Sequence, residues 1–325
     1  MNFKALTPEM TMAKNRRIVD QPVDPRFSAI VVTFRTGSVL FDSLAALVEQ
    51  PSVCEVIVVD NGNPDRVACD LDRLASTESK ISLLRPGRNL GFASGCNLGA
   101  AQARGEYLAF VNPDLIVPIG SFDVIKGAIA DYPDAWLLGA RLLNMDGSEQ
   151  KGGRREVLTP WRAIVELARL DRLAPSHPYF KRFHLQDGAP PDHPVEVPTI
   201  SGAFMVVPRD RFSALSGFDQ AMFLHIEDID LCLRVLLAGG RVLYCGNVPV
   251  YHARSTSDTS RCFVEWHKTR SSIIYFLKHF RSSYPAWSLY LISAMLLLRF
   301  LLVAIQAAPK DGARLARRLA AGKGN

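Results

Sequence analysis

The chain has 325 residues, 48% of them hydrophobic, which is enough for one large α/β domain with an appendage or for two domains. Its formal net charge of +6 at pH 7 suits anionic partners, meaning phosphates, acidic lipids or nucleic acid. The six cysteines lie far apart and form no Cys-x-x-Cys pair. Neither a zinc ribbon nor a disulfide framework is therefore indicated, and we expect reduced thiols in a protein that faces the cytosol.

The first half of the chain predicts alternating strands and helices. Residues 1–26 are polar and lack the apolar segment of a signal peptide, so we expect a flexible N-terminal arm. Short apolar runs predict buried strands over residues 27–33, 53–59, 81–84 and 107–111. Helices are predicted between them, over residues 38–50, 67–76 and 90–103. This order with short connections predicts a mainly parallel central sheet flanked by helices.

The second half is less regular. A helix over 122–131 and a strand over 136–142 precede polar turns, a helix over 159–173 and a long loop over 174–198. The strand predicted over 197–207 is broken at Ser201 and Gly202, where glycine permits close approach by a ligand. A helix begins at Glu227, strands follow over 241–244 and 248–251, and another helix covers 263–280.

The C-terminal region has a distinct composition. Residues 287–308 are almost entirely apolar with Arg299 as their only charge, and basic residues follow at Lys310, Arg314, Arg317, Arg318 and Lys323. The segment is long enough to cross a bilayer, but a central arginine is costly there. We favour an interfacial or re-entrant helix with a basic tail at the cytoplasmic leaflet. A transmembrane span and a core helix are the alternatives.

Two acidic motifs lie at the ends of predicted elements. One follows a strand, at the edge where parallel α/β sheets bind ligands, and the other begins a helix. Asp114 follows the strand over 107–111, beside Asn112, and a carboxylate at that position can hold a hard cation through oxygen. The alternative is an Asn-Pro-Asp turn. Glu227 and Asp228 fall in the first turn of a helix, where acidic residues also complement the helix dipole without any catalytic role.

Taken in order, these motifs resemble the family 2 inverting glycosyltransferases of the GT-A fold, in their bacterial rhamnosyltransferase-like branch. The resemblance covers about residues 27–280 and rests on the order and spacing of short motifs. They are the strand ending at Thr33, Val-Val-Asp60-Asn-Gly, Arg88-Asn89-Leu-Gly91-Phe, Asn97, Asn112-Pro-Asp114, Ser201-Gly202-Ala, Glu227-Asp228-x-Asp230 and His252. The chain has no Gly-x-Gly-x-x-Gly motif, which disfavours a dinucleotide-binding dehydrogenase.

The resemblance implies a Rossmann-like α/β domain over 27–280, with a nucleotide-sugar-binding half (27–118) and an acceptor and catalytic half (119–280). Residues 281–325 then form an apolar, membrane-associating helix and its basic tail. The donor-binding residues that it implies are Thr33, Asp60, Arg88, Asn89, Gly91, Asn97, Asn112, Ser201 and Gly202. An Asx turn at Asp60 and a plain helix-capping loop at residues 88–91 are the alternatives for those motifs.

The resemblance also implies a metal and a base. Asp114 corresponds to the last Asp of the family's Asp-x-Asp motif and His252 to a late histidine of the metal shell, for Mg²⁺ or Mn²⁺. Asn112 replaces the first Asp, which leaves strict metal dependence open, and His252 could be an ordinary strand-end histidine. Asp228 corresponds to the general base, with Glu227 and Asp230 orienting it or the acceptor. Because like charges lie together, we expect a raised pKa at the base.

The expected function is inverting transfer of a sugar from a nucleoside-diphosphate donor, with dTDP-L-rhamnose favoured by resemblance only. The expected acceptor is a hydroxyl of a lipid-linked or cell-surface polysaccharide, at the cytoplasmic face of the plasma membrane, with the protein peripheral or monotopic. The alternatives are another nucleotide sugar such as a UDP-hexose, or a non-catalytic nucleotide-sugar-binding protein. No aromatic-interleaved basic stretch indicates nucleic-acid binding, and a homo-oligomer stays open.

Overall fold

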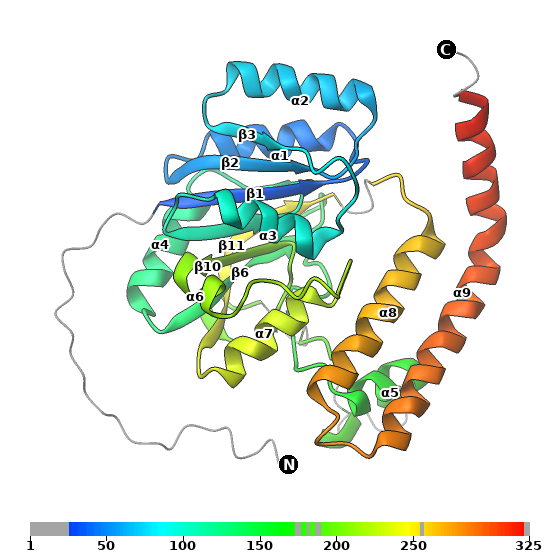
Figure 1. Ribbon diagram of the computed structural model, residues 1–325. Coiled ribbons are helices and arrows are strands. Elements are labelled where there is room, and N and C mark those ends of the chain that lie inside the picture. Colours follow the sequence, from blue (N-terminus) through cyan, green and yellow to red (C-terminus); the bar gives the residue numbers. More distant parts are fainter. Residues whose placement is uncertain (1–25, 173–176, 181–182, 186–189, 254–256, 322–325) are drawn as a thin grey trace.

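The computed structural model describes residues 26–172, 177–180, 183–185, 190–253 and 257–321. The expected N-terminal arm lies almost entirely outside these residues. At the centre is a nine-stranded sheet in the order β3-β2-β1-β4-β10-β6-β11-β5, with β8 added on β11 (Figure 1). A separate two-stranded sheet pairs β7 with β9.

The first half of the sheet is parallel, as predicted. Its strands are β1 (Phe27–Thr33), β2 (Val53–Asp60), β3 (Ile81–Leu84) and β4 (Tyr107–Val111). The helices that connect them are α1 (Val39–Val48), α2 (Asp65–Thr77) and α3 (Phe92–Gln102), and α4 (Ser121–Asp131) follows β4. Strands β1, β2 and β4 are buried on both faces, which explains why their sequences are continuous apolar runs.

The second half of the sheet is mixed, which the sequence did not indicate. Its strands are β5 (Leu115–Ile116), β6 (Ala135–Leu143), β8 (Pro194–Glu196), β10 (Phe204–Pro208) and β11 (Arg241–His252). Strand β10 is antiparallel to both β4 and β6, whereas β6 and β11 are parallel. The two strands predicted over 241–251 form one strand, β11, whose register shifts between Cys245 and Pro249. Extra residues in one strand of a pair bend it without ending it.

Helices cover both faces of the sheet. Helices α1, α2 and α4 contribute to the apolar cluster on one face. Helices α3, α6 (Arg209–Ala214) and α7 (Glu227–Leu237) contribute to the cluster on the other. The remaining short elements are β7 (Arg154–Arg155), β9 (Thr199–Ile200) and the 3₁₀ turns η2 (Leu170–Arg172) and η3 (Pro178–Phe180).

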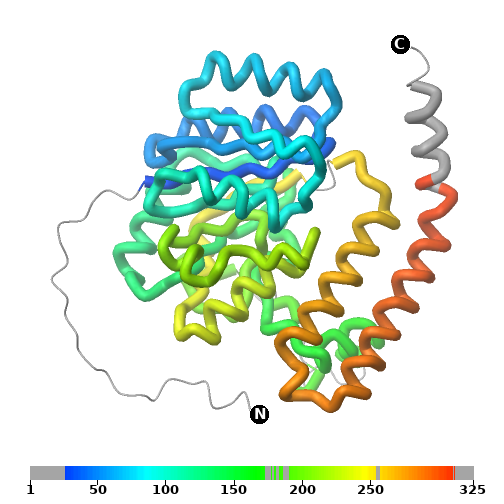
Figure 2. The backbone as a smooth tube through the Cα atoms, viewed as in Figure 1, coloured from blue at the N-terminus to red at the C-terminus, as the bar shows by residue number. Residues whose placement is uncertain are grey.

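A third apolar cluster joins α7 to a helical subdomain made of α5 (Pro160–Ala168), α8 (Arg261–His279) and α9 (Ala286–Ala321). Figures 1 and 2 show α8 and α9 side by side, with α9 on the outside. Two polar contacts fix them. Arg299 pairs with Glu265 of α8 at 2.9 Å, and the Asp311 carboxylate accepts from the backbone N–H groups of Arg261 and Cys262 at the start of α8.

Candidate active site

A cleft of about 1580 Å³ opens at the carboxyl end of β4, between the loops that follow the parallel strands and helices α5, α7, α8 and α9. Many of the predicted site residues line it: Asn89, Gly91, Asn112, Asp114, Ser201, Gly202, Glu227, Asp228 and His252. Parallel sheets place ligands at this edge because the strand ends and their loops converge there. The structure therefore brings both acidic motifs into one cavity.

The first polar centre of the cleft is the pair Asp114 and His252. Strand β11 ends beside β5, so His252 faces Leu115 in the sheet, and its Nε2 lies 3.1 Å from Asp114 Oδ1. Gln150 holds the other side of the ring, with Oε1 3.0 Å from Nδ1. The Gln150 amide also donates from Nε2 to the His252 carbonyl oxygen at 2.8 Å. This second bond sets the orientation of the amide, so Nδ1–H donates to Gln150, and Nε2 is the ring nitrogen that faces Asp114.

This pair suits a divalent cation. A carboxylate oxygen and an imidazole nitrogen face each other, and both atom types are ligands that Mg²⁺ or Mn²⁺ accepts. The 3.1 Å between them is close to the spacing of neighbouring ligands on an octahedral ion with bonds of about 2.1 Å. Among the described residues no group of three or more His, Cys, Asp or Glu side chains could hold a metal. The other ligands would therefore come from the substrate and water.

The second polar centre is Asp228, in the first turn of α7. Its Oδ2 accepts from Arg155 at 2.5 Å and from the backbone N–H of Gly202 at 2.9 Å. Its Oδ1 accepts from the N–H of Ile229 at 2.8 Å. Burial would raise the pKa of Asp228, but the Arg155 guanidinium and the two N–H groups outweigh it and hold that pKa below its usual value.

Glu227, rather than Asp228, has the raised pKa. Its side chain is buried, its Oε2 has no hydrogen-bond partner among the described residues, and the charge of Asp228 is close by. Burial first, and the Asp228 charge second, raise the pKa of Glu227 well above its usual value. The expectation that packed carboxylates raise the pKa of Asp228 was therefore wrong, because Arg155, a residue without a predicted role, neutralises it.

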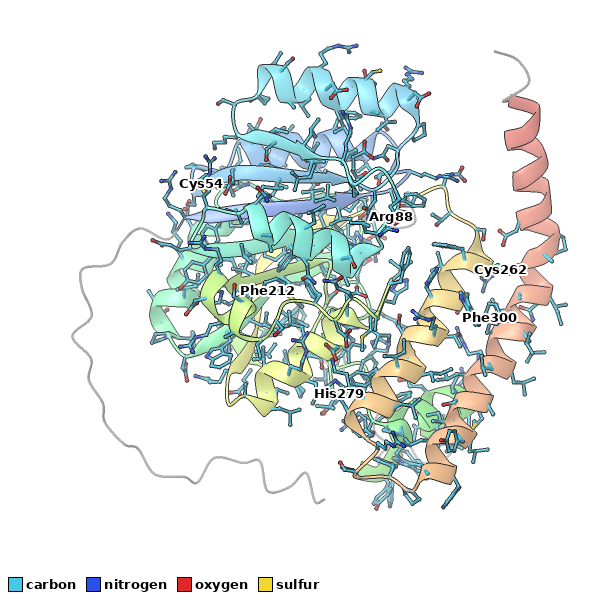
Figure 3. All side chains as sticks on the ribbon, viewed as in Figure 1. Cys54, Arg88, Phe212, Cys262, His279 and Phe300 are labelled. Atoms are coloured by element: carbon cyan, nitrogen blue, oxygen red, sulfur yellow. The ribbon has the colours of Figure 1, made fainter. Side chains whose placement is uncertain are left out.

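Asp230 was predicted to orient the base or the acceptor, and the structure does not place it for that role. Its side chain is fully buried. Its carboxylate oxygens lie 2.7 Å from Arg234 Nε, 2.9 Å from Lys278 Nζ and 2.7 Å from His279 Nε2. Burial opposes its charge, but these three partners lower the pKa of Asp230 to about 2. Figure 3 shows His279 at the C-terminal end of α8, so Asp230 ties α7 to α8 rather than facing the cleft.

Two of the predicted donor-binding residues make hydrogen bonds within the protein, and their contact with the donor stays a prediction. Thr33 is fully buried and its hydroxyl donates to Thr36 at 3.0 Å. Asp60 Oδ1 accepts from the N–H groups of Gly62 and Asn63, and Oδ2 lies 3.4 Å from Arg85. Asp60 thus forms the Asx turn that was the alternative for this motif.

Two other predicted donor residues lie at the edge of the site. Arg88, on the loop before α3 (Figure 3), and Asn97 line a smaller hollow beside the cleft. The Asn97 amide exchanges hydrogen bonds with the backbone of Phe218, at 2.8 and 2.9 Å, and so fixes α3 to a turn. Both polar atoms of Asn97 thus bond to the protein backbone, and its contact with the donor stays a prediction.

Two glycines let the backbone close around the site. Gly91 has a φ of 83°, and a Cβ there would collide with the carbonyl oxygen of Phe223. A Cβ on Gly202 would lie 2.9 Å from that of Asp228, so only glycine lets its N–H reach the carboxylate. The chain enters α7 through His225 and Ile226 at φ values of 64° and 75°. Such a conformation is costly for a β-branched residue and marks the turn that aims Glu227 and Asp228.

Comparison with known proteins finds glycosyltransferases. The Glycosyl transferase family 2 sequence family matches residues 28–203. The N-acetylglucosaminyl-diphospho-decaprenol L-rhamnosyltransferase of Mycobacterium tuberculosis is 28% identical over 253 residues, which are 70% of this chain and 76% of that protein. The Rhamnosyltransferase WbbL of Escherichia coli is 51% identical over 53 residues, 16% of this chain and 19% of that one.

Solved structures share the fold. GalNAc-T7 with UDP, GalNAc and Mn²⁺ aligns with a TM-score of 0.56 and 14% identity, over 79% of this chain and 48% of that chain. The mannosyltransferase PcManGT of Pyrobaculum calidifontis, with GDP-Man and Mn²⁺, aligns with a TM-score of 0.53 and 18% identity, over 91% and 76%. The predicted GT-A architecture is confirmed.

Proposed function

Because this chain belongs to glycosyl transferase family 2 and is therefore a glycosyltransferase, we propose that it transfers L-rhamnose from dTDP-L-rhamnose to a lipid-linked saccharide. The observation that carries the proposal is the meeting of the Asp114–His252 pair and Asp228 in one cleft. The mycobacterial relative is named as an L-rhamnosyltransferase for an N-acetylglucosaminyl-diphospho-decaprenol, which supports the donor and the acceptor class.

The donor side of the reaction depends on Asp114 and His252. We propose that they hold Mg²⁺ or Mn²⁺, which stabilises the leaving nucleoside diphosphate as a Lewis acid. Gln150 keeps His252 in the tautomer whose Nε2 can bind a metal. The loop at Asn89 and Gly91 lines the same cleft and approaches the donor through its backbone.

The acceptor side depends on Asp228. Arg155 keeps the Asp228 carboxylate ionised. The carboxylate can therefore accept the proton of the attacking hydroxyl directly. Attack from the face opposite the leaving group gives inversion in one displacement. Glu227 retains its proton to a higher pH than an ordinary glutamate and would act as a hydrogen-bond donor that positions the acceptor.

We also propose that α9 holds the protein at the cytoplasmic face of the membrane as a peripheral or monotopic helix. It is the one helix in the described part of the chain, over Ala286–Pro309, that is long and apolar enough to cross a bilayer. Its outer face exposes Trp287, Tyr290, Leu291, Leu298, Leu301, Leu302 and Ile305. Its inner face packs on α8 and pairs Arg299 with Glu265, which favours a helix lying in the interface over one surrounded by lipid.

A panel of nucleotide sugars with Mn²⁺ tests the donor. A ligand at 100 times its Kd stabilises the folded state by about 2.7 kcal/mol, so dTDP-L-rhamnose should raise the Tm measurably and UDP-sugars should not. Transfer is then followed with a short-chain prenyl-diphosphate saccharide as acceptor. A larger shift with a UDP-hexose would replace rhamnose by that sugar, and no turnover with any donor would refute the proposal.

A further inference from the structure

The part of the cleft between α5, α8 and α9 combines an apolar wall with positive charge. Its apolar lining comes from Leu158, Ala163, Leu167, Phe183, Phe276 and Leu296. Sugars and nucleotides present hydroxyl and phosphate groups, and an extended apolar wall offers such groups no hydrogen bonds. This half of the cleft therefore fits a ligand with an apolar chain.

Lys268 of α8 reaches into the same space. Its ammonium group has no hydrogen-bond or ion-pair partner among the described residues, because the nearby Glu265 carboxylate is bound to Arg299 at 2.9 Å. The side chain is open to the cleft, yet many protein atoms surround it. Burial lowers the pKa of Lys268, and the charges of Arg299 and Arg155 add to this effect, which outweighs the opposing charges of Glu265 and Asp228. Arg299 and Arg155 are already paired with Glu265 and Asp228, whereas Lys268 has no ion pair of its own within the described part of the chain, so an anionic ligand would supply its counter-charge.

We propose that this half of the cleft binds a prenyl diphosphate, with Lys268 and Arg155 contacting the diphosphate and the apolar wall contacting the first isoprene units. The inference rests on the proposed function, since this diphosphate would belong to the lipid-linked acceptor. Arg155 already touches Asp228. A diphosphate beside Arg155 therefore places the sugar attached to it next to the proposed base.

The position of α9 gives the lipid a route. Leu296 on its inner face lines the cleft and is only 8% exposed, whereas Leu298 on its outer face is 59% exposed. One helix thus forms both a wall of the binding site and the apolar face that we assign to the membrane. The route that follows for a prenyl chain runs from the bilayer along α9 into the cleft beside Leu296.

Isothermal titration of the full-length protein with three probes tests the site: geranyl diphosphate, geraniol and inorganic diphosphate. The wild type should bind geranyl diphosphate more tightly than either of the others. Lys268→Gln should weaken that binding by about 10- to 100-fold, the usual effect of losing a charged hydrogen bond. Lys268→Arg should retain most of it, and Lys126→Gln, on α4 away from the cleft, should have no effect.

The outcomes separate this inference from the proposed function. Donor binding is measured independently by the Tm shift with dTDP-L-rhamnose and Mn²⁺, and Lys268→Gln should leave it unchanged. If the donor shift is present but geranyl diphosphate binds wild type and Lys268→Gln equally, the lipid site is refuted alone. Equal affinity for inorganic diphosphate would reduce it to a plain anion site and also refutes it. Failure of every donor would overturn the proposed function, while the geranyl diphosphate titration would still report on the site itself.

Discussion

Asp228→Asn and Glu227→Gln together identify the base. With Asp228 as the base, Asp228→Asn should lower kcat by about 10²–10⁴-fold and leave donor binding nearly unchanged. Glu227→Gln should cost far less, because the raised pKa of Glu227 means that it already carries a proton where an ordinary glutamate would not. The amide of glutamine reproduces the shape and donor capacity of a protonated carboxyl group.

The pH profile of the wild type gives a second, independent measurement. A general base works only when deprotonated, so the rate falls as pH drops through its pKa. Arg155 holds the pKa of Asp228 below its usual value of 3.8, so kcat/KM should show no acid limb between about pH 5 and 8 from this group. The pKa of Glu227 lies well above 4.5. If Glu227 were the base, the acid limb would lie at a correspondingly higher pH.

Stability must be measured beside the rate, because Asp228→Asn also removes structural contacts. Both oxygens of Asp228 accept from N–H donors, one from Arg155 and Gly202 and the other from Ile229. An asparagine has one acceptor oxygen, so a buried N–H group loses its partner at a cost of about 1–3 kcal/mol. Single-turnover rates are therefore taken per folded molecule, with folding followed by circular dichroism. Near-normal turnover in Asp228→Asn would refute the assignment.

Further variants test the remaining contacts. Arg155→Gln removes the charge that lowers the pKa of the base, so the acid limb of kcat/KM should move to higher pH, and an unmoved limb would count against the pairing. Asp230→Asn should cost about 3–5 kcal/mol of unfolding free energy in chemical denaturation, with little change in kcat per folded molecule. Asp114→Ala should abolish the Mn²⁺-dependent Tm shift by the donor while leaving the unliganded Tm close to that of wild type. Leu298→Asp should weaken binding to anionic vesicles in flotation, whereas Leu237→Asp, at an equally exposed leucine of α7, should not.

Much of the fold was predictable because β1, β2 and β4 are short, apolar and buried on both faces. The first four strands were predicted to within a residue, since a short continuous apolar run between turn residues is typical of a buried strand. The direction of β10 was not predictable, because it depends on where the chain returns after α5 and the long loop. The join of two predicted strands into β11 depends on its pairing with β6, which holds the strand together across the bulge.

The acidic motifs were found from sequence because they stand at element boundaries, where parallel sheets and helices expose side chains. The role expected for Asp230 could have been rejected from helix geometry alone. Residues two apart on a helix point about 200° away from each other, so Asp228 and Asp230 cannot both face the cleft. Arg155 could not be found in this way, because it lies 73 residues before Asp228 and meets it only through the small sheet of β7 and β9.

The sequence left three interpretations of the apolar C-terminal segment: an interfacial or re-entrant helix, a transmembrane span and a core helix. The contacts of Arg299 bear on all three. That arginine was the objection to membrane contact, yet it faces Glu265 across the α8–α9 interface rather than the exposed face of the helix. Leu289, Ile292 and Leu296 on the same inner side are buried in the third apolar cluster. The helix is thus a core helix on one side, and its other side exposes the apolar residues that we propose to contact the membrane. Deleting it would remove a wall of the cleft together with the proposed anchor, so only substitutions on the outer face can separate membrane binding from catalysis.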